Sequence, residues 1–432
     1  MILKAKTESQ AKDFWTFSQL DTNCLRLEIK GLWLFQGRVN IDALQNSLIK
    51  TLDFYPHLSG RIAGKGINMN NAGVEWQIVE QERISTVDVR KNQHALSDFN
   101  SGLKHSQMIK GKAPLLSVQV TNISDGYVIC VHCSHVCLDG DGFYSFVNNW
   151  SKLHRGETID VTIEKALVLF QQSHTKEEVE QSAIANKWHK MNASILWQFA
   201  IIGITKVFSK VTEPIFISDN TIDAIKQSLF DKTAIKYGTH AILSALITRM
   251  FMRLNNANPE DIYSQMSVMD IRNRFESINQ NYAGNAITTI PTPEFKASVS
   301  FDVLVEIIDN SIKEMLNDRQ RFADFVILNM ETANMKVPYL PLDLKKMNAR
   351  KPQAIYINNM RRFPVYDVDF GTGKPIWTPP NDLSDIVKIW PTAPDHEKGV
   401  EIYIRGYLVT KIKRIKDLNR WIQEIIDSLL NN

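Results

Sequence analysis

The sequence of 432 residues lacks several features that mark specialised classes of protein. Four cysteines cannot supply the dense disulfide framework of a small secreted domain. A formal net charge of +3 is too balanced for a protein built to bind a phosphate backbone, so nucleic acid is not an expected partner. No internal repeat of solenoid type is present. These absences leave a globular protein with a large core, which the hydrophobic content of 44% supports.

Long apolar runs are also scarce. The start, from Met1 to Lys6, lacks the apolar stretch of a signal peptide, which together with the few cysteines predicts a cytoplasmic location. The most apolar long segment, from Ala193 to Phe208, is interrupted by Ser194, Gln198, Gly203 and Thr205 and is shorter than the roughly 20 residues that span a bilayer. We expect a buried or surface-lying helix there, with membrane contact through this segment as the less favoured alternative.

Strand and helix patterns alternate along the chain, which indicates an α/β protein. A polar and then apolar stretch without a clear strand separates two halves, so we expect an N-terminal half over 1–180, a crossover over 181–215 and a C-terminal half over 216–432. The predicted strands are 25–35, 115–120, 127–132, 262–269, 354–358, 385–390 and 400–404. The predicted helices are 41–52, 143–154, 221–230, 239–254, 301–316 and 418–430.

The first motif with catalytic potential lies where a strand ends in a histidine and is followed by a glycine-rich turn. It contains His135, Asp139, Gly140 and Gly142, and helix 143–154 follows it. Histidine suits proton transfer near neutral pH. The spacing His-x-x-x-Asp is common by chance, and a second match begins at His94. We interpret His94 as a surface residue because its surroundings are polar, and His135 as the functional one because an apolar strand precedes it.

Metal and thiol chemistry are the alternatives for the same stretch. His132, Cys133, His135 and Cys137 offer zinc ligands, but no second Cys/His cluster completes a tetrahedral site, and strand alternation would put His132 on the opposite face. The acidic turn after Leu138 does not have the oxygen ligands of a calcium loop. A cysteine nucleophile beside the histidine stays open, although both thiols are more simply small buried hydrophobic groups. We therefore expect no bound metal.

The second motif is Asp-Phe-Gly-x-Gly, from Asp369 to Gly373, and it is far rarer by chance than the first. Two glycines and the following Pro375 around Phe370 describe a tight loop. A kinase reading of Asp-Phe-Gly fails because neither a His-Arg-Asp loop nor a glycine-rich nucleotide loop precedes it.

The two motifs together resemble those of the BAHD family of acyl-CoA-dependent acyltransferases. The resemblance spans most of the chain and includes short pieces in the family's order. These pieces are Leu20-Asp21, Tyr55-Pro56, Gly60-Arg61, Asp270 to Arg274 and Tyr282 to Ala286. It implies two similar α/β domains of the chloramphenicol acetyltransferase-like type, each a mixed sheet flanked by helices. It also implies acyl transfer from acyl-CoA to a hydroxyl or amine of a small-molecule acceptor in a channel between the domains.

The resemblance implies a role for each matching residue. His135 would be the general base in the channel, and Asp139 would point toward Arg272 as a structural ion pair. Gly140, Asp369, Gly371 and Gly373 would support the structure. The chain departs from the family at Thr372, where tryptophan is usual, so Thr372 or Asn285 is the candidate for holding the oxyanion or lining the channel.

Acyl-CoA is expected as a co-substrate, with no tightly bound cofactor, and the family precedent favours a monomer. Thr239, at the start of a helix, and Lys374 are candidates for binding its phosphates. Two basic runs offer further cations: Lys345, Lys346, Arg350, Lys351, Arg361 and Arg362, then Lys411, Lys413, Arg414 and Lys416. A solvated charged face is the alternative for these residues.

Two rival functions remain open on the sequence. A condensation-type enzyme that uses carrier-bound acyl groups shares the expected fold and has a His-His-x-x-x-Asp-Gly signature, in which this chain has Ser134 for the first histidine. A non-catalytic ligand-binding relative of the fold is supported only by Thr372.

Overall fold

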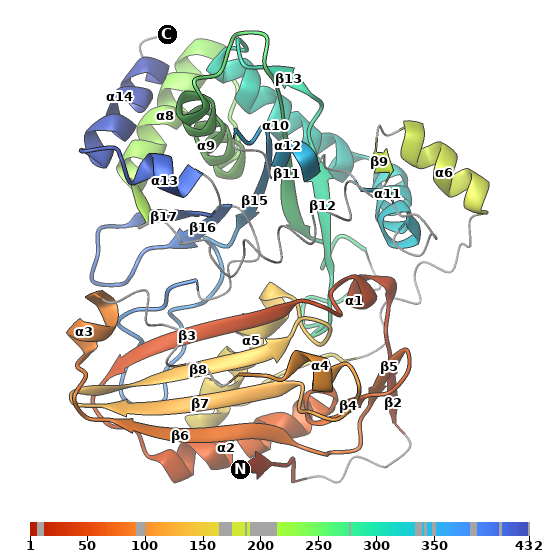
Figure 1. Cartoon of the computed structure of the whole chain (residues 1–432), viewed down its shortest axis with the longest axis vertical. Helices are drawn as coiled ribbons and strands as arrows, with labels where there is room; N and C mark the ends of the chain where they lie inside the picture. Colours follow the sequence, from red (N-terminus) through yellow and green to blue (C-terminus); the bar gives the residue numbers. More distant parts are fainter. Residues whose placement is uncertain are drawn as a thin grey trace.

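Figure 1 shows the computed structural model of the chain, with the N-terminal half below the C-terminal half in this view. The structure describes residues 1–6, 13–91, 99, 102–163, 175–185, 188–190, 214–275, 278–332, 339–340, 344–347, 351–380, 387–405 and 408–430. His94, the segment from Ala193 to Phe208 and most of the predicted crossover lie outside these residues.

The N-terminal half is built on a five-stranded mixed sheet. Its strand order is β1 (Ile2–Leu3), β6 (Val74–Gln81), β7 (Leu116–Ile123), β8 (Gly126–Ser134) and β3 (Glu28–Gln36). β6 and β7 are parallel, and the other neighbours are antiparallel. Helices α2 (Ile41–Phe54) and α5 (Gly140–His154) lie together behind the sheet in Figure 1. Every residue of β8 is buried, which matches its nearly continuous apolar sequence.

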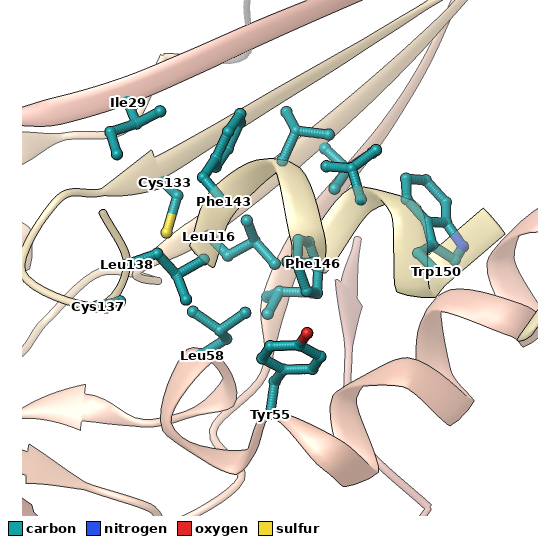
Figure 2. Packing of buried hydrophobic residues seen from close by; sticks show 14 of the residues in the cluster. Ile29, Tyr55, Leu58, Leu116, Cys133, Cys137, Leu138, Phe143, Phe146 and Trp150 are labelled. Carbon is teal, nitrogen blue, oxygen red and sulfur yellow. The ribbon is translucent and has the colours of Figure 1, made fainter. Parts of the chain in front are cut away.

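Aromatic residues of α5 fill the space between this helix and the sheet. Figure 2 shows Phe143, Phe146 and Trp150 along α5, with Leu116 and Tyr55 nearby. Fully burying side chains of this size stabilises a fold by about 1.5–3 kcal/mol each. The packing of α5 on the sheet therefore anchors the turn that precedes the helix.

The C-terminal half has a seven-stranded mixed sheet. Its main path runs β10 (Ile215–Ser218), β17 (Gly399–Ile404), β16 (Val387–Pro391), β15 (Ala354–Asn359), β11 (Ile262–Asp270) and β12 (Ile287–Pro291), and β13 (Phe295–Lys296) pairs with β11. β15 is parallel to β11 and to β16. Helices α8 (Asp219–Thr233), α9 (Thr239–Asn255), α10 (Phe301–Asn317), α13 (Leu408–Ile412) and α14 (Leu418–Leu430) contribute to its hydrophobic core.

The remaining elements are short or peripheral. Strands β2 (Phe14–Thr16), β4 (Arg61–Ile62) and β5 (Gly66–Asn68) form a small sheet, and β9 (His189–Lys190) pairs with β14 (Tyr339–Leu340). The other helices are α1 (Gln19–Asn23), η1 (Pro56–Ser59), α3 (Thr86–Lys91), α4 (His105–Met108), α6 (Lys176–Ala185), α11 (Arg319–Thr332) and α12 (Leu344–Met347).

One segment of the C-terminal half packs in the N-terminal core. After β15, the chain brings Val365, Val368 and Phe370 into the hydrophobic cluster of the N-terminal sheet. The indole N–H of Trp33 donates to the carbonyl of Val365 at 2.9 Å, and Leu34 forms an isolated bridge with Trp377. The part of the chain predicted as the C-terminal half thus contributes a loop to the core of the other half.

The predicted α/β fold with two mixed sheets flanked by helices is confirmed. The strand and helix predictions match observed elements, but α5 begins at Gly140, so the glycine-rich lead-in is its first turn. The parallel pairing of β6 with β7 and helices such as α1 and α11 were missed. Strand alternation was also expected to separate His132 from Cys133, His135 and Cys137, but it cannot apply to His135 and Cys137, because β8 ends at Ser134 and a turn follows.

Candidate active site

His135 lies in the turn that connects β8 to α5. The backbone N–H of His135, just after Ser134 ends the strand, donates to the carbonyl of Leu27 at 3.0 Å. Asp139 caps α5, because its Oδ1 accepts from the backbone N–H of Gly142 at 2.9 Å. The turn is fixed at both ends, and these contacts hold the partly exposed imidazole between them.

Asn285 sets the protonation pattern of the His135 ring. Asn285 Nδ2 lies 2.9 Å from Asp21 Oδ1, 2.9 Å from the carbonyl of His135 and 3.2 Å from the carbonyl of Val136. Since all three atoms are acceptors, Nδ2 must be the donating nitrogen of the amide. Asn285 Oδ1 lies 3.0 Å from Nδ1 of His135 and can only accept, so Nδ1 carries a proton. In the neutral ring Nε2 then has the lone pair that a general base needs.

The same contacts correct the role expected for Asn285. Its side chain is fully buried, and its two amide hydrogens are directed at Asp21 and backbone carbonyls. It is not among the residues that line the cavity described below. Asn285 therefore does not hold an oxyanion or line a channel, and it orients His135 instead.

Asp21 orients Asn285 in turn. Its carboxylate accepts from the backbone N–H and the hydroxyl of Ser18, at 2.8 and 2.7 Å, as well as from Asn285. Only 1% of Asp21 is exposed, and burial raises the pKa of its carboxyl to about 6, although the hydrogen bonds from Ser18 and Asn285 act in the opposite direction. The family resemblance included Asp21 only within the short segment Leu20-Asp21, without a role for its side chain. The available signal was the Ser18-x-x-Asp21 capping box of α1.

Asp139 and Arg272 form a buried bidentate ion pair. Nη1 of Arg272 lies 2.8 Å from Oδ2 of Asp139, and Nη2 lies 2.9 Å from Oδ1. The backbone N–H of Ala286 also donates to Asp139, and Arg272 donates to the carbonyls of Tyr282 and Gly284. The pair therefore joins the start of α5 to the segment that carries Asn285.

Two further carboxylates lie beside this guanidinium. Asp270 Oδ1 is 2.9 Å from Nη1 of Arg272, and Asp141 Oδ2 is 3.8 Å from its Nε. Burial raises the pKa of Asp141 to about 6, against the attraction of Arg272. The Asp139 side chain is fully buried, whereas 46% of the Asp270 side chain is exposed.

A cavity of about 460 Å³ lies between the two halves and reaches His135. This volume is typical of small-molecule sites. The N-terminal half contributes Leu20, Lys30 and His135 to its wall, among others, and the C-terminal half contributes Thr288, Asn358 and Lys388. Gly140 and Asp141 also line it, whereas Asp139 and Arg272 do not. A second cavity of about 380 Å³ shares Asp141 with the first.

The loop of the second motif lies away from this cavity. Gly371 and Gly373 have φ values of 89° and 93°, which favour glycine, and both of their N–H groups donate to Oδ1 of Asp369. Phe370 is buried, with its ring centroid 4.7 Å from that of Trp150 on α5. The loop is thus a tight turn with an aromatic anchor in the N-terminal core.

The position of Thr372 does not fit the roles expected for it, which were to hold an oxyanion or to line the channel. Its hydroxyl is 2.7 Å from the hydroxyl of Tyr127, near the start of β8. His135 follows the other end of this strand, about 23 Å away at the usual rise per residue. Thr372 therefore cannot reach a group held at His135.

The expected phosphate-binding residues do not line the cavity. Thr239 begins α9, and Lys374 forms an exposed ion pair with Asp367 at 2.9 Å. Of the described residues in the two basic runs, none lines the cavity, and Arg361 pairs with Asp219 at 2.8 Å. The cations that do line it are Lys30 and Lys388, which sequence reasoning missed. A lysine within a predicted strand is the signal that was available for both.

The thiols near His135 are buried in the N-terminal core. Cys133 and Cys137 are fully buried, and burial raises the pKa of the Cys137 thiol well above its usual value. Figure 2 shows both among the apolar side chains of the core. In the part of the chain that the structure describes, no group of three or more His, Cys, Asp or Glu side chains is arranged to hold a metal ion. None of the helices among the described residues is long and apolar enough to cross a membrane.

Comparison with known proteins gives the family. Residues 1–408 match the Transferase family. The chain is 24% identical over 385 residues to the BAHD acyltransferase DCR of Arabidopsis thaliana, covering 80% of this chain and 74% of that protein. The chain belongs to the Transferase family, of the BAHD type, and is an acyltransferase.

Solved structures show the fold of this BAHD acyltransferase in other proteins. F. sporotrichioides TRI101, complexed with coenzyme A and T-2, has a TM-score of 0.71 at 12% identity, with 95% of this chain and 99% of that chain covered. The first condensation domain of the CDA synthetase has a TM-score of 0.60 at 10% identity, with 98% and 96% covered. At these identities the likeness concerns the fold alone.

Proposed function

We propose that this BAHD acyltransferase transfers an acyl group from acyl-CoA to a hydroxyl or amine of a small-molecule acceptor, with His135 as the general base. The observation that carries the proposal is the position of His135 on a cavity between the halves, with Asn285 holding its Nδ1–H. A basic Nε2 on a cavity of this size suits removal of a proton from a small nucleophile.

The reaction would proceed by direct attack. Nε2 of His135 takes the proton as the acceptor oxygen or nitrogen bonds to the thioester carbon. The tetrahedral intermediate then collapses, the carbon–sulfur bond breaks, and the CoA thiolate takes the proton back from the imidazolium. A cysteinyl intermediate is not required, and the burial of Cys133 and Cys137 argues against one.

Asp139 and Arg272 would act as positioning residues in this scheme. Their ion pair holds the first turn of α5 against the segment with Asn285, so the His135 turn and its hydrogen-bond partner keep a fixed relation. The Asp369 to Gly373 loop would likewise support the structure without touching substrate, whereas Gly140 would support the first turn of α5 and also lines the cavity.

Acyl-CoA as the co-substrate is supported by the relatives. The TRI101 structure contains coenzyme A, and DCR is named as a BAHD acyltransferase. We propose that the acceptor occupies the cavity of about 460 Å³ and that acyl-CoA approaches from the side of the second cavity, since Asp141 lines both.

Particular residues weaken the case for each of the two rival functions. A condensation-type enzyme is similar in fold, but Ser134 stands where its signature has the first histidine. The non-catalytic alternative depended on Thr372, which lies beside Tyr127 and away from His135.

The test is transfer by the purified full chain. Acetyl-CoA and longer acyl-CoAs are supplied with a panel of hydroxyl and amine acceptors, and thiol release and acylated products are measured. We expect acceptor-dependent thiol release that His135→Ala abolishes while the thermal melting temperature stays unchanged. His94→Ala, at the other sequence match, is the control. Absence of transfer with every donor, or equal loss in His94→Ala, would show that the proposed function or its base is wrong.

A further inference from the structure

Asn359, the last residue of β15, lines the cavity that reaches His135. The wall next to it lies against the start of α5, because Met360 and Phe363, which also line the cavity, approach Gly140. A Cβ added to Gly140 would be 2.8 Å from the Phe363 ring and 3.6 Å from the methyl carbon of Met360. Asn359 therefore belongs to the part of the cavity that adjoins the turn with His135.

Two contacts fix which end of the Asn359 amide is the donor. The backbone N–H of Arg361 donates to Oδ1 of Asn359 at 3.2 Å, and Nδ2 lies 3.1 Å from Nδ1 of His240 on α9. The reverse orientation of the amide would place Nδ2 against the N–H of Arg361, which is also a donor. Nδ2 therefore donates to His240. Nδ2 has two hydrogens, and the contacts of Asn359 with the described residues use one, so the second is available to a molecule in the cavity.

His240 has the tautomer that this contact requires. Since Nδ1 accepts from Asn359, the proton of the neutral ring lies on Nε2, which is 2.8 Å from the hydroxyl oxygen of Ser267 on β11. The same oxygen accepts from Nε2 of Gln265 at 3.2 Å, and Oε1 of Gln265 accepts from the hydroxyl of Thr248 at 3.2 Å. The polar side chains between α9 and β11 thus hold the imidazole with its acceptor nitrogen toward Asn359.

The imidazole of His240 is neutral near physiological pH. Burial lowers its pKa to about 4, although the charge of Asp309 acts in the opposite direction. A second ring proton would lie on Nδ1, against the donating Nδ2 of Asn359. His240 is therefore a fixed acceptor that keeps the Asn359 amide in one orientation.

The chemistry of the donor indicates what it can bind. An amide N–H carries no charge, and its hydrogen bond suits a neutral oxygen such as an ether, a carbonyl or a hydroxyl. A donor that loses access to water and gains no partner costs free energy, so a site with such a donor rejects an analogue that lacks the oxygen. The proposed function places the small acceptor in this cavity.

We propose that Asn359 is a substrate-binding residue that donates a hydrogen bond to a neutral oxygen of the acceptor other than the acylated one, and that His240 is its positioning residue. The preferred acceptor is then a hydroxyl or amine compound with an additional ether, carbonyl or hydroxyl oxygen. This inference rests on the proposed function, because it names the substrate class of the same site.

The experiment compares alcohols that differ only in an ether oxygen or a methylene group. The pairs are phenoxyethanol with phenylpropanol, para-methoxybenzyl alcohol with para-ethylbenzyl alcohol, and tetrahydropyranyl methanol with cyclohexyl methanol, and the donors are acetyl-CoA and benzoyl-CoA. In at least one pair, we expect kcat/KM for the ether to exceed that for the methylene compound by about 5- to 10-fold, the usual contribution of a neutral hydrogen bond. Asn359→Ala should reduce this ratio to near one and leave the KM for acyl-CoA unchanged.

Two variants of His240 separate its positioning role from a structural one. His240→Asn keeps an acceptor oxygen near the place of Nδ1, whereas His240→Gln keeps a donor toward Ser267 near the place of Nε2 and loses the acceptor. We expect His240→Asn to retain the ether preference and His240→Gln to lose most of it, with similar thermal melting temperatures. The imidazole ¹⁵N shifts that disappear in His240→Gln should be those of a ring protonated at Nε2.

Several results would overturn the inference and leave the proposed function standing. These are an ether preference absent from every pair, a preference that survives in Asn359→Ala, and a His240 ring protonated at Nδ1. Equal loss in His240→Asn and His240→Gln would overturn the positioning role of His240. A raised KM for acyl-CoA in Asn359→Ala with an unchanged ratio would assign Asn359 to the acyl donor instead. If amines are acylated and none of these alcohols is, the inference fails alone; if amines are not acylated either, the proposed function fails with it.

Discussion

Replacing Asp139 with asparagine tests whether the buried ion pair holds the catalytic turn together. Asparagine is also a good N-cap, so it retains the bond to Gly142, but it removes the charge opposite Arg272 and presents a donor to either Arg272 or the N–H of Ala286. Breaking a buried pair by removing one partner costs about 3–5 kcal/mol. Because Asp270 stays 2.9 Å from the guanidinium, we expect the lower end, about 3 kcal/mol of the free energy of unfolding.

The matched control is Asp270→Asn on the same guanidinium. The Asp270 side chain is 46% exposed, so its loss should cost about 0–1 kcal/mol after solvent screening. Urea unfolding followed by circular dichroism measures both variants, and acyl transfer is assayed in parallel. Transfer should fall strongly in Asp139→Asn and little in Asp270→Asn. Equal unfolding energies for the two variants would refute the reasoning that burial makes the Asp139 pair the structural one.

Three further variants test other contacts of the site. Asn285→Ala should lower kcat by about 100-fold or more, because the proton of the neutral His135 ring can then lie on Nε2 instead of Nδ1. The imidazole ¹⁵N shifts should change from those of a ring protonated at Nδ1 to those of a mixture of the two tautomers. An unchanged tautomer would contradict this prediction. Asp21 has its pKa raised from 3.8 to about 6, so the folded state binds a proton that the unfolded state has lost, and this group makes stability fall as pH rises from 4 to 6. Across this pH window, the free energy of unfolding of the wild type should accordingly fall by about 3 kcal/mol relative to that of Asp21→Asn, as measured by urea titrations. A difference between the two proteins that does not change with pH would exclude the burial effect. Gly142→Ala would place a Cβ 2.3 Å from the carbonyl oxygen of Ala283, so unfolding should become easier by about 1–3 kcal/mol; a neutral result would mean that α5 can move without cost.

Local patterns predicted the elements that hold the site but not all of their limits. The apolar run of β8, the glycine-rich turn and helix α5 follow from strand and capping signals. The sequence could not show that Asp139 caps the helix at Gly140, because its lead-in glycines suggested a loop. The family motifs pointed to His135, Asp139 and Arg272 as site residues. The resemblance also suggested Thr372 and Asn285 for the oxyanion or the channel, whereas Thr372 contacts Tyr127 and Asn285 contacts Asp21 and His135.

What the sequence determined by itself is therefore the α/β class, the turn with His135 and the tight loop from Asp369 to Gly373, since these depend on neighbours within a few residues. Only the tertiary structure decided the chain of contacts from Asp21 through Asn285 to His135, in which partners are 264 and 150 residues apart. The same holds for Lys30 and Lys388, which lie on different sheets. Such contacts exist only when the two halves pack together, and propensity and periodicity contain no information about which distant faces will meet.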